Sequence, residues 1–360
     1  MSDLPPPPRW RTPARGTDRN PETRFDAHAR EGVDDGWTPD EPALARTQVT
    51  VERPRTIIAR NTSPDISFDR SINPYRGCEH GCIYCFARPS HGYLGMSPGL
   101  DFETKLVARP DAAAVLERQL RARSYRPATI AIGTNTDPYQ PIERDWRVMR
   151  GVLEVLERFG HPVAIATKGV MVERDIDILS RMSARGLARV GISVTTLDAG
   201  LARTMEPRVP SPARRLRAIE TLARAGVETR VMVSPVVPGL TDAEIDRILA
   251  SARDAGAVAA SWIMLRLPFE VAGLFEDWLE RHAPDRKAKV LARVREMHGG
   301  QLYSAEWGHR MRGEGLFADL TAKRFDLAVR RLGLRTELPP LRTDLFKVPL
   351  GDAVQPSLFG

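Results

Sequence analysis

Cysteine is scarce in this chain: the sequence of 360 residues contains three, and all of them lie between Cys78 and Cys85. An odd number of cysteines in one short window argues against a disulfide framework of the kind that stabilises small secreted domains. The sequence also lacks an apolar run long enough for a transmembrane helix, and its first residues lead into four prolines at positions 5–8 instead of a signal peptide. We therefore expect a protein of the reducing cytoplasm with no membrane partner.

Lysine is also scarce, since only six of the 53 basic residues are lysine and arginine supplies the rest. The net charge of +7 and the isoelectric point near 9.6 favour acidic partners, of which nucleic acid is the usual one. A general compositional preference for arginine would produce the same excess without a DNA-binding surface. Charge alone leaves both interpretations open.

The three cysteines are spaced as C-x3-C-x2-C, at Cys78, Cys82 and Cys85. Three thiolates within one loop suit a [4Fe-4S] cluster, and because such a cluster has four irons, one iron keeps an open coordination position. The alternative metal site is zinc bound by the three cysteines and by His80 or His91. His80 lies inside the loop rather than at a usual ligand spacing, which favours the cluster.

Composition divides the chain into four regions. Residues 1–60 are rich in Pro, Arg, Asp and Gly, and we expect a largely disordered leader there. Residues 61–290 alternate short apolar runs with longer amphipathic stretches and form the expected core. Residues 291–335 are expected to be a helical extension, and residues 336–360 a flexible tail.

Six apolar runs in the core, each followed by a predicted helix, recur at a spacing of roughly thirty residues. They span residues 71–76, 128–132, 162–166, 190–194, 229–233 and 261–265. Pro110 and a capping box that begins at Thr241 are typical helix starts, whereas Gly160 and Gly226 are typical helix ends. This rhythm predicts parallel strands joined by crossover helices, in either a partial barrel or a doubly wound sheet.

The cysteine motif resembles that of the radical S-adenosylmethionine enzymes, and its surroundings resemble the spore photoproduct lyase-like branch. The resemblance rests on residues 73–78, on Tyr84 directly before Cys85, and on segments 205–208, 211–212 and 215–216, and it covers about residues 67–334. It implies an α/β fold with a partial (β/α)6 TIM-like barrel, whose chemistry lies at the C-terminal ends of the strands. It also implies a [4Fe-4S] cluster, S-adenosylmethionine and an external electron donor.

In this family the reduced cluster transfers one electron to S-adenosylmethionine, and the resulting 5'-deoxyadenosyl radical abstracts hydrogen from a substrate. The resemblance implies that Cys78, Cys82 and Cys85 bind the cluster. The expected S-adenosylmethionine contacts are Tyr84 near the adenine, Gly133, Thr134, Asn135 and Asp137 at the amino group, Ser193 at the ribose, and Lys168 or Arg215 at the carboxylate. Ordinary strand-to-helix turns and solvated helix charges are the competing explanation for these residue types.

One feature of the resemblance is missing. Spore photoproduct lyase returns a hydrogen atom to its product through a cysteine outside the cluster, and this chain has no such cysteine. Either a tyrosine near the strand ends replaces it, with Tyr93 and Tyr139 as candidate catalytic residues beside Tyr75, or the reaction is not photoproduct reversal.

The end of the chain contains Gln355, Ser357, Leu358 and Phe359, which resemble the short motif by which bacterial repair proteins bind the sliding clamp. A tail that packs on its own domain is the alternative. Together these features predict a lyase-like radical enzyme that acts on a damaged or modified base in nucleic acid, as in DNA repair. The alternatives are a radical enzyme acting on a peptide or small metabolite, and a non-enzymatic, redox-sensing DNA-binding protein that carries a cluster.

Overall fold

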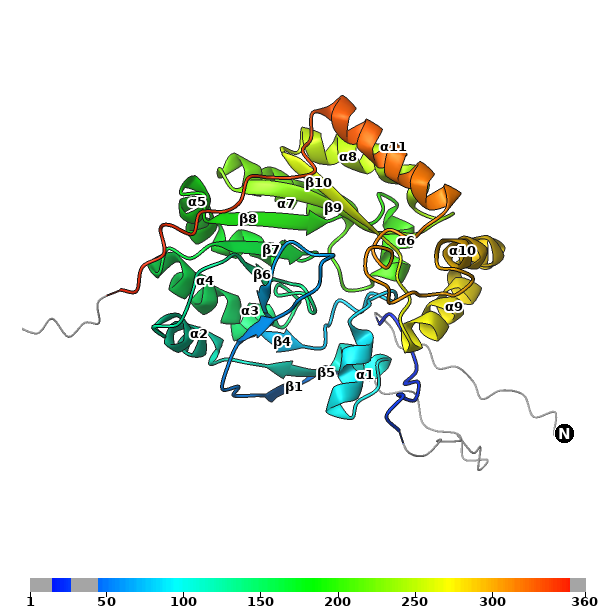
Figure 1. The fold of residues 1–360 in the computed structure, drawn as a ribbon. Helices are drawn as coiled ribbons and strands as arrows, with labels where there is room; N and C mark the ends of the chain where they lie inside the picture. Colours follow the sequence, from blue (N-terminus) through cyan, green and yellow to red (C-terminus); the bar gives the residue numbers. More distant parts are fainter. Residues whose placement is uncertain (1–14, 27–44, 350–360) are drawn as a thin grey trace, which may run out of the picture.

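The computed structural model describes residues 15–26 and 45–349, and its centre is a seven-stranded sheet (Figure 1). The strand order is β10-β9-β8-β7-β6-β3-β2. All neighbouring pairs from β3 to β10 are parallel, and β2 pairs antiparallel with β3. The strands are β2 (Ile58–Arg60), β3 (Arg70–Ile72), β6 (Ile130–Ile132), β7 (Val163–Thr167), β8 (Ala188–Ser193), β9 (Glu228–Val236) and β10 (Ala259–Met264).

The strand order decides between the two predicted architectures. A doubly wound sheet reverses its strand order at a switch point, whereas the parallel strands here follow the chain without reversal. The α/β fold of partial-barrel type is therefore confirmed. The first predicted run, residues 71–76, is not one continuous strand. It is interrupted at Pro74, which has no N–H to donate to a neighbouring strand. The residues after it form β4 (Tyr75–Arg76), which pairs with β5 (Lys105–Ala108) in a second sheet.

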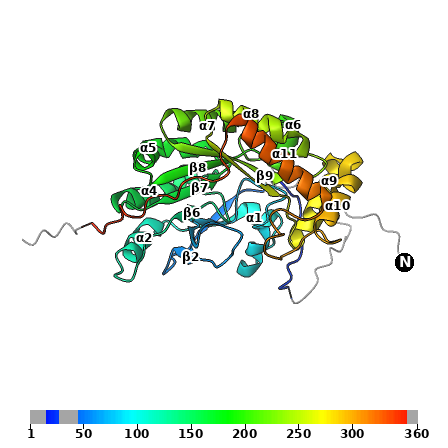
Figure 2. The ribbon, with the colours of Figure 1, turned by 45° about the horizontal axis from the view of Figure 1, so that its top comes forward.

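Helices pack against the outer face of the sheet (Figure 2). Their apolar side chains recur at helical spacing; the buried residues of α8, for example, are Ile245, Ile248, Leu249 and Ala252. No helix within the described ranges has the length and apolar character needed to cross a membrane. The helices are α1 (Leu100–Thr104), α2 (Ala112–Leu120), α3 (Glu143–Trp146), α4 (Val148–Arg158), α5 (Ile176–Ala184), α6 (Ala199–Met205), α7 (Pro212–Arg224), α8 (Ile245–Asp254), α9 (Glu270–His282), α10 (Pro284–Met297) and α11 (Leu316–Leu332), with 3-10 helices η1 (Arg88–Leu94), η2 (Val170–Asp175) and η3 (Asp242–Glu244).

The described part of the expected leader contacts the rest of the protein in two places. Strand β1 (Gln48–Val51) pairs with β5 (Lys105–Ala108), and β4 completes this three-stranded sheet. Residues 15–26 pack on the core, where Arg19 forms an ion pair of 2.5 Å with Asp277 of α9. The partners of these segments lie far along the chain, so local composition did not reveal the pairing.

The described part of the expected flexible tail also packs on the body. The amide of Arg342 donates to the carbonyl of Gly186, and that of Lys347 donates to Phe159, both at 3.0 Å. This segment crosses the end of the sheet where the strands begin, opposite to their C-terminal ends (Figure 1). The expected clamp motif at residues 355–359 lies outside the described residues.

The side chain of His161 packs against Phe346 of this tail segment. We expect it to make the folding stability of the protein decrease at acidic pH. Its buried ring accepts a hydrogen bond from the Tyr125 hydroxyl at 2.7 Å and donates one to the carbonyl of Pro162 at 3.0 Å. Burial lowers the pKa of His161 to about 4 from its usual 6.5. The unfolded chain therefore binds a proton that the folded chain excludes, and stability should fall by up to about 3 kcal/mol as the pH drops from about 6.5 to 4.

Urea unfolding of the wild type and of His161→Gln between pH 4 and pH 7 checks this prediction. The wild type should lose stability more steeply on acidification than the variant. Parallel pH profiles for the two proteins would rule out His161 as the cause.

Candidate active site

A cavity of about 190 Å³ lies at the C-terminal ends of the sheet strands. The three cysteines line one part of it. Residues from five successive strand ends line the rest. They are residues 133–137 after β6, Thr167 and Lys168 at β7, Ser193 at β8, Ser234 and Pro235 in β9, and Arg266 after β10.

A buried arginine holds the shape of the cysteine loop. The guanidinium of Arg88 donates to the carbonyls of Gly81 and Cys82 at 3.1 and 3.0 Å, and to those of residues 98 and 99 at 3.1 and 3.0 Å. Its fifth bond, of 2.5 Å, goes to the carboxylate of Glu103, and both side chains are fully buried. All five N–H donors of the guanidinium are therefore satisfied, and two of them hold the loop backbone.

Gly81 and Glu103 show how closely the loop is packed. Gly81 has a φ of +65°, and a Cβ there would lie 2.6 Å from the carboxylate of Glu103. The same oxygen of that carboxylate accepts the amide of Gly16 at 2.8 Å. Only glycine fits at position 81, and the described segment of the leader covers the loop from outside. Neither Arg88 nor Glu103 was identified from the sequence, because their spacing carries no periodic signal.

The donor set fits an iron–sulfur cluster. All three cysteines of the chain border one cavity, and burial raises the pKa of each thiol, so metal binding must favour the thiolate form. Across residues 15–26 and 45–349, no three His, Cys, Asp or Glu side chains converge closely enough for a single metal ion. The imidazole of His80 lies 3.3 Å from Asp137, and that of His91 lies 2.9 Å from the carbonyl of Lys105. These contacts disfavour the zinc alternative.

The loop after β6 is fastened to β7. At Gly133, with a φ of +90°, a Cβ would lie 1.9 Å from the carbonyl oxygen of Ala166, so the chain passes β7 only because this residue is glycine. Asp137 accepts hydrogen bonds from the Thr167 hydroxyl at 2.5 Å and from the Lys168 amide at 2.6 Å.

Asp137 is thereby held in its charged form. Although burial favours the neutral acid, the adjacent His80 and these hydrogen bonds lower the pKa of Asp137 to about 2. Its oxygens are occupied by protein donors. Thr134 and Asn135 also line the cavity, and within the described part of the chain their side chains make no hydrogen bond, which leaves them available to a ligand.

Three further groups in the lining are available to a ligand. Lys168 extends its ammonium group to 5.6 Å from the ring centroid of Tyr84 and forms no direct ion pair among the described residues. The Ser193 hydroxyl donates to the carbonyl of Ser234 at 2.9 Å and keeps its lone pairs as acceptors. The Ser234 hydroxyl is buried without a partner in the described structure, which is costly unless a ligand supplies one.

Tyr84 lines the cavity, and its hydroxyl donates to the buried carboxylate of Glu206. Arg215 donates to the other oxygen of Glu206 at 2.7 Å and to the carbonyl of Ser193 at 2.8 Å. The placement of Arg215 corrects its expected contact with the methionine carboxylate: it is fully buried behind the cavity wall because its guanidinium pairs with Glu206. The sequence motif at residues 205–208 contained Glu206, but its role was missed.

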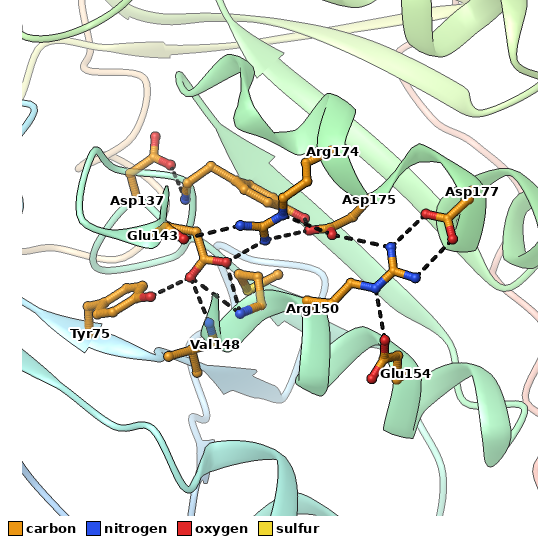
Figure 3. Close-up of polar contacts among 11 residues, drawn as sticks. Tyr75, Asp137, Glu143, Val148, Arg150, Glu154, Arg174, Asp175 and Asp177 are labelled. Carbon is orange, nitrogen blue, oxygen red and sulfur yellow. Dashed lines mark hydrogen bonds and ion pairs between the residues drawn. The ribbon is translucent and has the colours of Figure 1, made fainter. Parts of the chain in front are cut away.

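The three tyrosines expected near the strand ends lie away from the cavity. Tyr75 donates to Glu143 in a buried polar network (Figure 3), and the Tyr139 hydroxyl donates to Asp175 at 3.1 Å in the same network. Tyr93 lies on η1 and is 71% exposed. This corrects the candidate catalytic placement of Tyr93 and Tyr139, since one faces solvent and the other points into the network. Of the tyrosines in the described part of the chain, the cavity lining contains Tyr84 alone.

Comparisons with known proteins are consistent with a metal-binding role for the cysteine loop. Residues 72–252 match the model of the radical SAM superfamily. An uncharacterized protein of Mycobacterium tuberculosis is 39% identical over 235 residues, which cover 65% of this chain and 68% of that protein. A structure of a spore photoproduct lyase variant superposes with a TM-score of 0.60 at 16% identity, over 83% of this chain and 85% of that chain.

A second structure, of spore photoproduct lyase complexed with dinucleoside spore photoproduct, has a TM-score of 0.57 at 17% identity over the same shares. At these identities the likeness shows the fold, and it confirms the spore photoproduct lyase-like resemblance at that level. With the family model spanning both the cysteine loop and the strands around the cavity, the chain belongs to the radical SAM superfamily, as an enzyme whose cofactors are a [4Fe-4S] cluster and S-adenosylmethionine.

Proposed function

We propose that this enzyme performs radical chemistry on a damaged or modified base in nucleic acid. The observation that carries the proposal is that the cavity with the three thiols also contains an aromatic–arginine pair. The guanidinium carbon of Arg266 lies 4.9 Å from the ring centroid of Phe86, and both side chains line the cavity. Aromatic rings and guanidinium planes are the groups on which proteins stack unpaired bases.

One comparison supports the same substrate class: the related fold of spore photoproduct lyase occurs in complex with dinucleoside spore photoproduct. The net charge of +7 suits a polyanionic substrate.

In this proposal Cys78, Cys82 and Cys85 hold the cluster, and the polar lining holds S-adenosylmethionine. When reduced by an external electron donor, the two cofactors supply a carbon radical that abstracts hydrogen from the substrate. We assign the roles in the lining as follows: Tyr84 packs near the adenine, Ser193 accepts from the ribose, Thr134 and Asn135 bind the amino group, Lys168 pairs with the carboxylate, and Gly133 and Asp137 shape the loop.

Anaerobic reconstitution of the cluster, followed by reduction and addition of S-adenosylmethionine, tests the proposal. The product 5'-deoxyadenosine is measured without DNA, with intact DNA and with ultraviolet-irradiated DNA, and Cys82→Ser is the inactive control. We expect irradiated DNA to stimulate its formation. Equal formation in all three samples would contradict a nucleic-acid substrate and favour a peptide or small metabolite.

A further inference from the structure

Aromatic rings and arginines form a line that starts at the cavity. Phe86 lines the cavity and is 45% exposed. Arg266, which lies over Phe86, also lies 5.9 Å from the ring centroid of Tyr303. The rings of Tyr303 and Phe269 follow, with centroids 6.4 Å apart. The line therefore continues from the cavity lining to the outer surface.

Beyond Phe269 the line continues on the described segment of the leader. The guanidinium carbon of Arg24 lies 4.1 Å from the ring centroid of Phe269 and 4.7 Å from that of Phe25. Phe269 is 60% exposed and Phe25 is 51% exposed. We call this set the aromatic–arginine ladder, and its members are Phe86, Arg266, Tyr303, Phe269, Arg24 and Phe25.

Folding alone does not account for the ladder. Phe269 has a φ of +50° and a ψ of −123°, a backbone conformation that is unfavourable for a bulky residue, and it nevertheless presents its ring to solvent. Neither Arg24 nor Arg266 forms an ion pair with a carboxylate in the described structure, and the buried Nε of Arg266 has no partner there. The ladder thus combines the exposed rings of Phe86, Phe269 and Phe25 with two arginines that form no direct ion pair in the described structure.

We propose that the aromatic–arginine ladder binds successive unpaired bases of single-stranded DNA and leads one of them into the cavity. Rings stack on any base, and the intervening guanidinium groups attract phosphates and stack as well. Bases within a duplex are already stacked on one another and cannot insert between these rings. The inference rests on the proposed function, because it specifies the substrate class as nucleotides that are unpaired or flipped out.

Fluorescence anisotropy of the full-length protein with labelled twelve-residue oligothymidylate tests the ladder. Truncation of one stacking ring weakens such binding by about fivefold or more, so we expect at least that loss for Phe269→Ala and a comparable loss for Arg24→Ala. Arg217→Ala is the matched control, because it removes an exposed positive charge from α7, away from the ladder. Its affinity should stay within about twofold of the wild type, as for one distant charge.

Three results would contradict single-stranded DNA binding by the ladder. They are weak binding of oligothymidylate by the wild type, equal affinity for a hairpin duplex of the same length, and ladder variants whose affinity equals that of the Arg217→Ala control. An oligouridylate arm shows whether the ladder distinguishes DNA from RNA. Phe269→Gly provides a second variant, since glycine fits a φ of +50° and removes the ring without strain. It should weaken binding as much as Phe269→Ala, with an unchanged or higher melting temperature.

The ladder and the proposed function can fail separately. If the variants lose oligothymidylate binding and the rate of 5'-deoxyadenosine formation does not depend on DNA, the ladder is supported and the proposed function is contradicted. Unchanged binding in the variants, together with stimulation by irradiated DNA, would contradict the ladder and support the function.

Discussion

Replacement of Arg88 by methionine is expected to abolish cluster binding and to destabilise the protein by about 3–5 kcal/mol. The variant leaves the Glu103 carboxylate buried without its counterion, and it frees the carbonyls of Gly81 and Cys82 that Arg88 holds. The cysteine loop then loses the hydrogen bonds that orient its thiols. Arg88→Lys should recover only part of the effect, because an ammonium group has three donors where the guanidinium has five.

Iron and sulfide content after anaerobic reconstitution measures cluster binding, and urea unfolding of the unreconstituted protein measures stability. Arg70→Met is the matched control, since Arg70 is a buried arginine paired with Asp69 at the start of β3, away from the cysteine loop. It should lose stability but keep full iron content. A full complement of iron in Arg88→Met would show that the loop does not need this arginine.

The second large effect is expected at the ion pair behind Tyr84. Arg215 and Glu206 are fully buried and 2.7 Å apart, so Arg215→Met should destabilise the protein by about 3–5 kcal/mol. Although burial favours the neutral acid, Arg215 lowers the pKa of Glu206 in the wild type. Without Arg215, burial is expected to raise that pKa above its value in the unfolded chain.

This reversal gives the variant a characteristic pH dependence. The folded Arg215→Met protein would bind a proton at Glu206 that the unfolded chain releases, so its stability should fall as the pH rises through the neutral range. The double variant Glu206→Leu/Arg215→Met should regain most of the lost stability, because it leaves no unpaired charge. Denaturation at pH 5.5 and pH 8 measures both effects. A single variant with the pH profile of the wild type would show that Glu206 stays charged without Arg215.

The parts of the site that could be predicted are those in which local pattern and sheet topology act together. The spacing of Cys78, Cys82 and Cys85 identified the metal-binding loop. The polar residues after each apolar run converged because parallel strands end at one edge of the sheet. The resemblance assigned Lys168 and Ser193 to S-adenosylmethionine, and both side chains line the cavity.

The parts that could not be predicted depend on pairs of residues far apart in the chain. Glu206 and Tyr84 meet across 122 positions, and no local signal links them. Tyr139 shows a second limit: it lies two residues after Asp137, yet its hydroxyl turns to Asp175 while Asp137 faces the cavity. The sequence located the turn but not the direction of its side chains. The pairing of β1 with β5 could not be predicted either, because its partners are far apart in the chain: Gln48 pairs with Lys105, 57 positions away.

We propose that a radical formed in this cavity takes a hydrogen atom from nucleic acid. The most direct measurement is the mass of the 5'-deoxyadenosine formed on ultraviolet-irradiated DNA from cells grown in deuterated medium. We expect deuterium in the 5'-deoxyadenosine, with none when the DNA is unlabelled. Product formed at the same rate but without deuterium would show that the hydrogen comes from elsewhere and would contradict a nucleic-acid substrate.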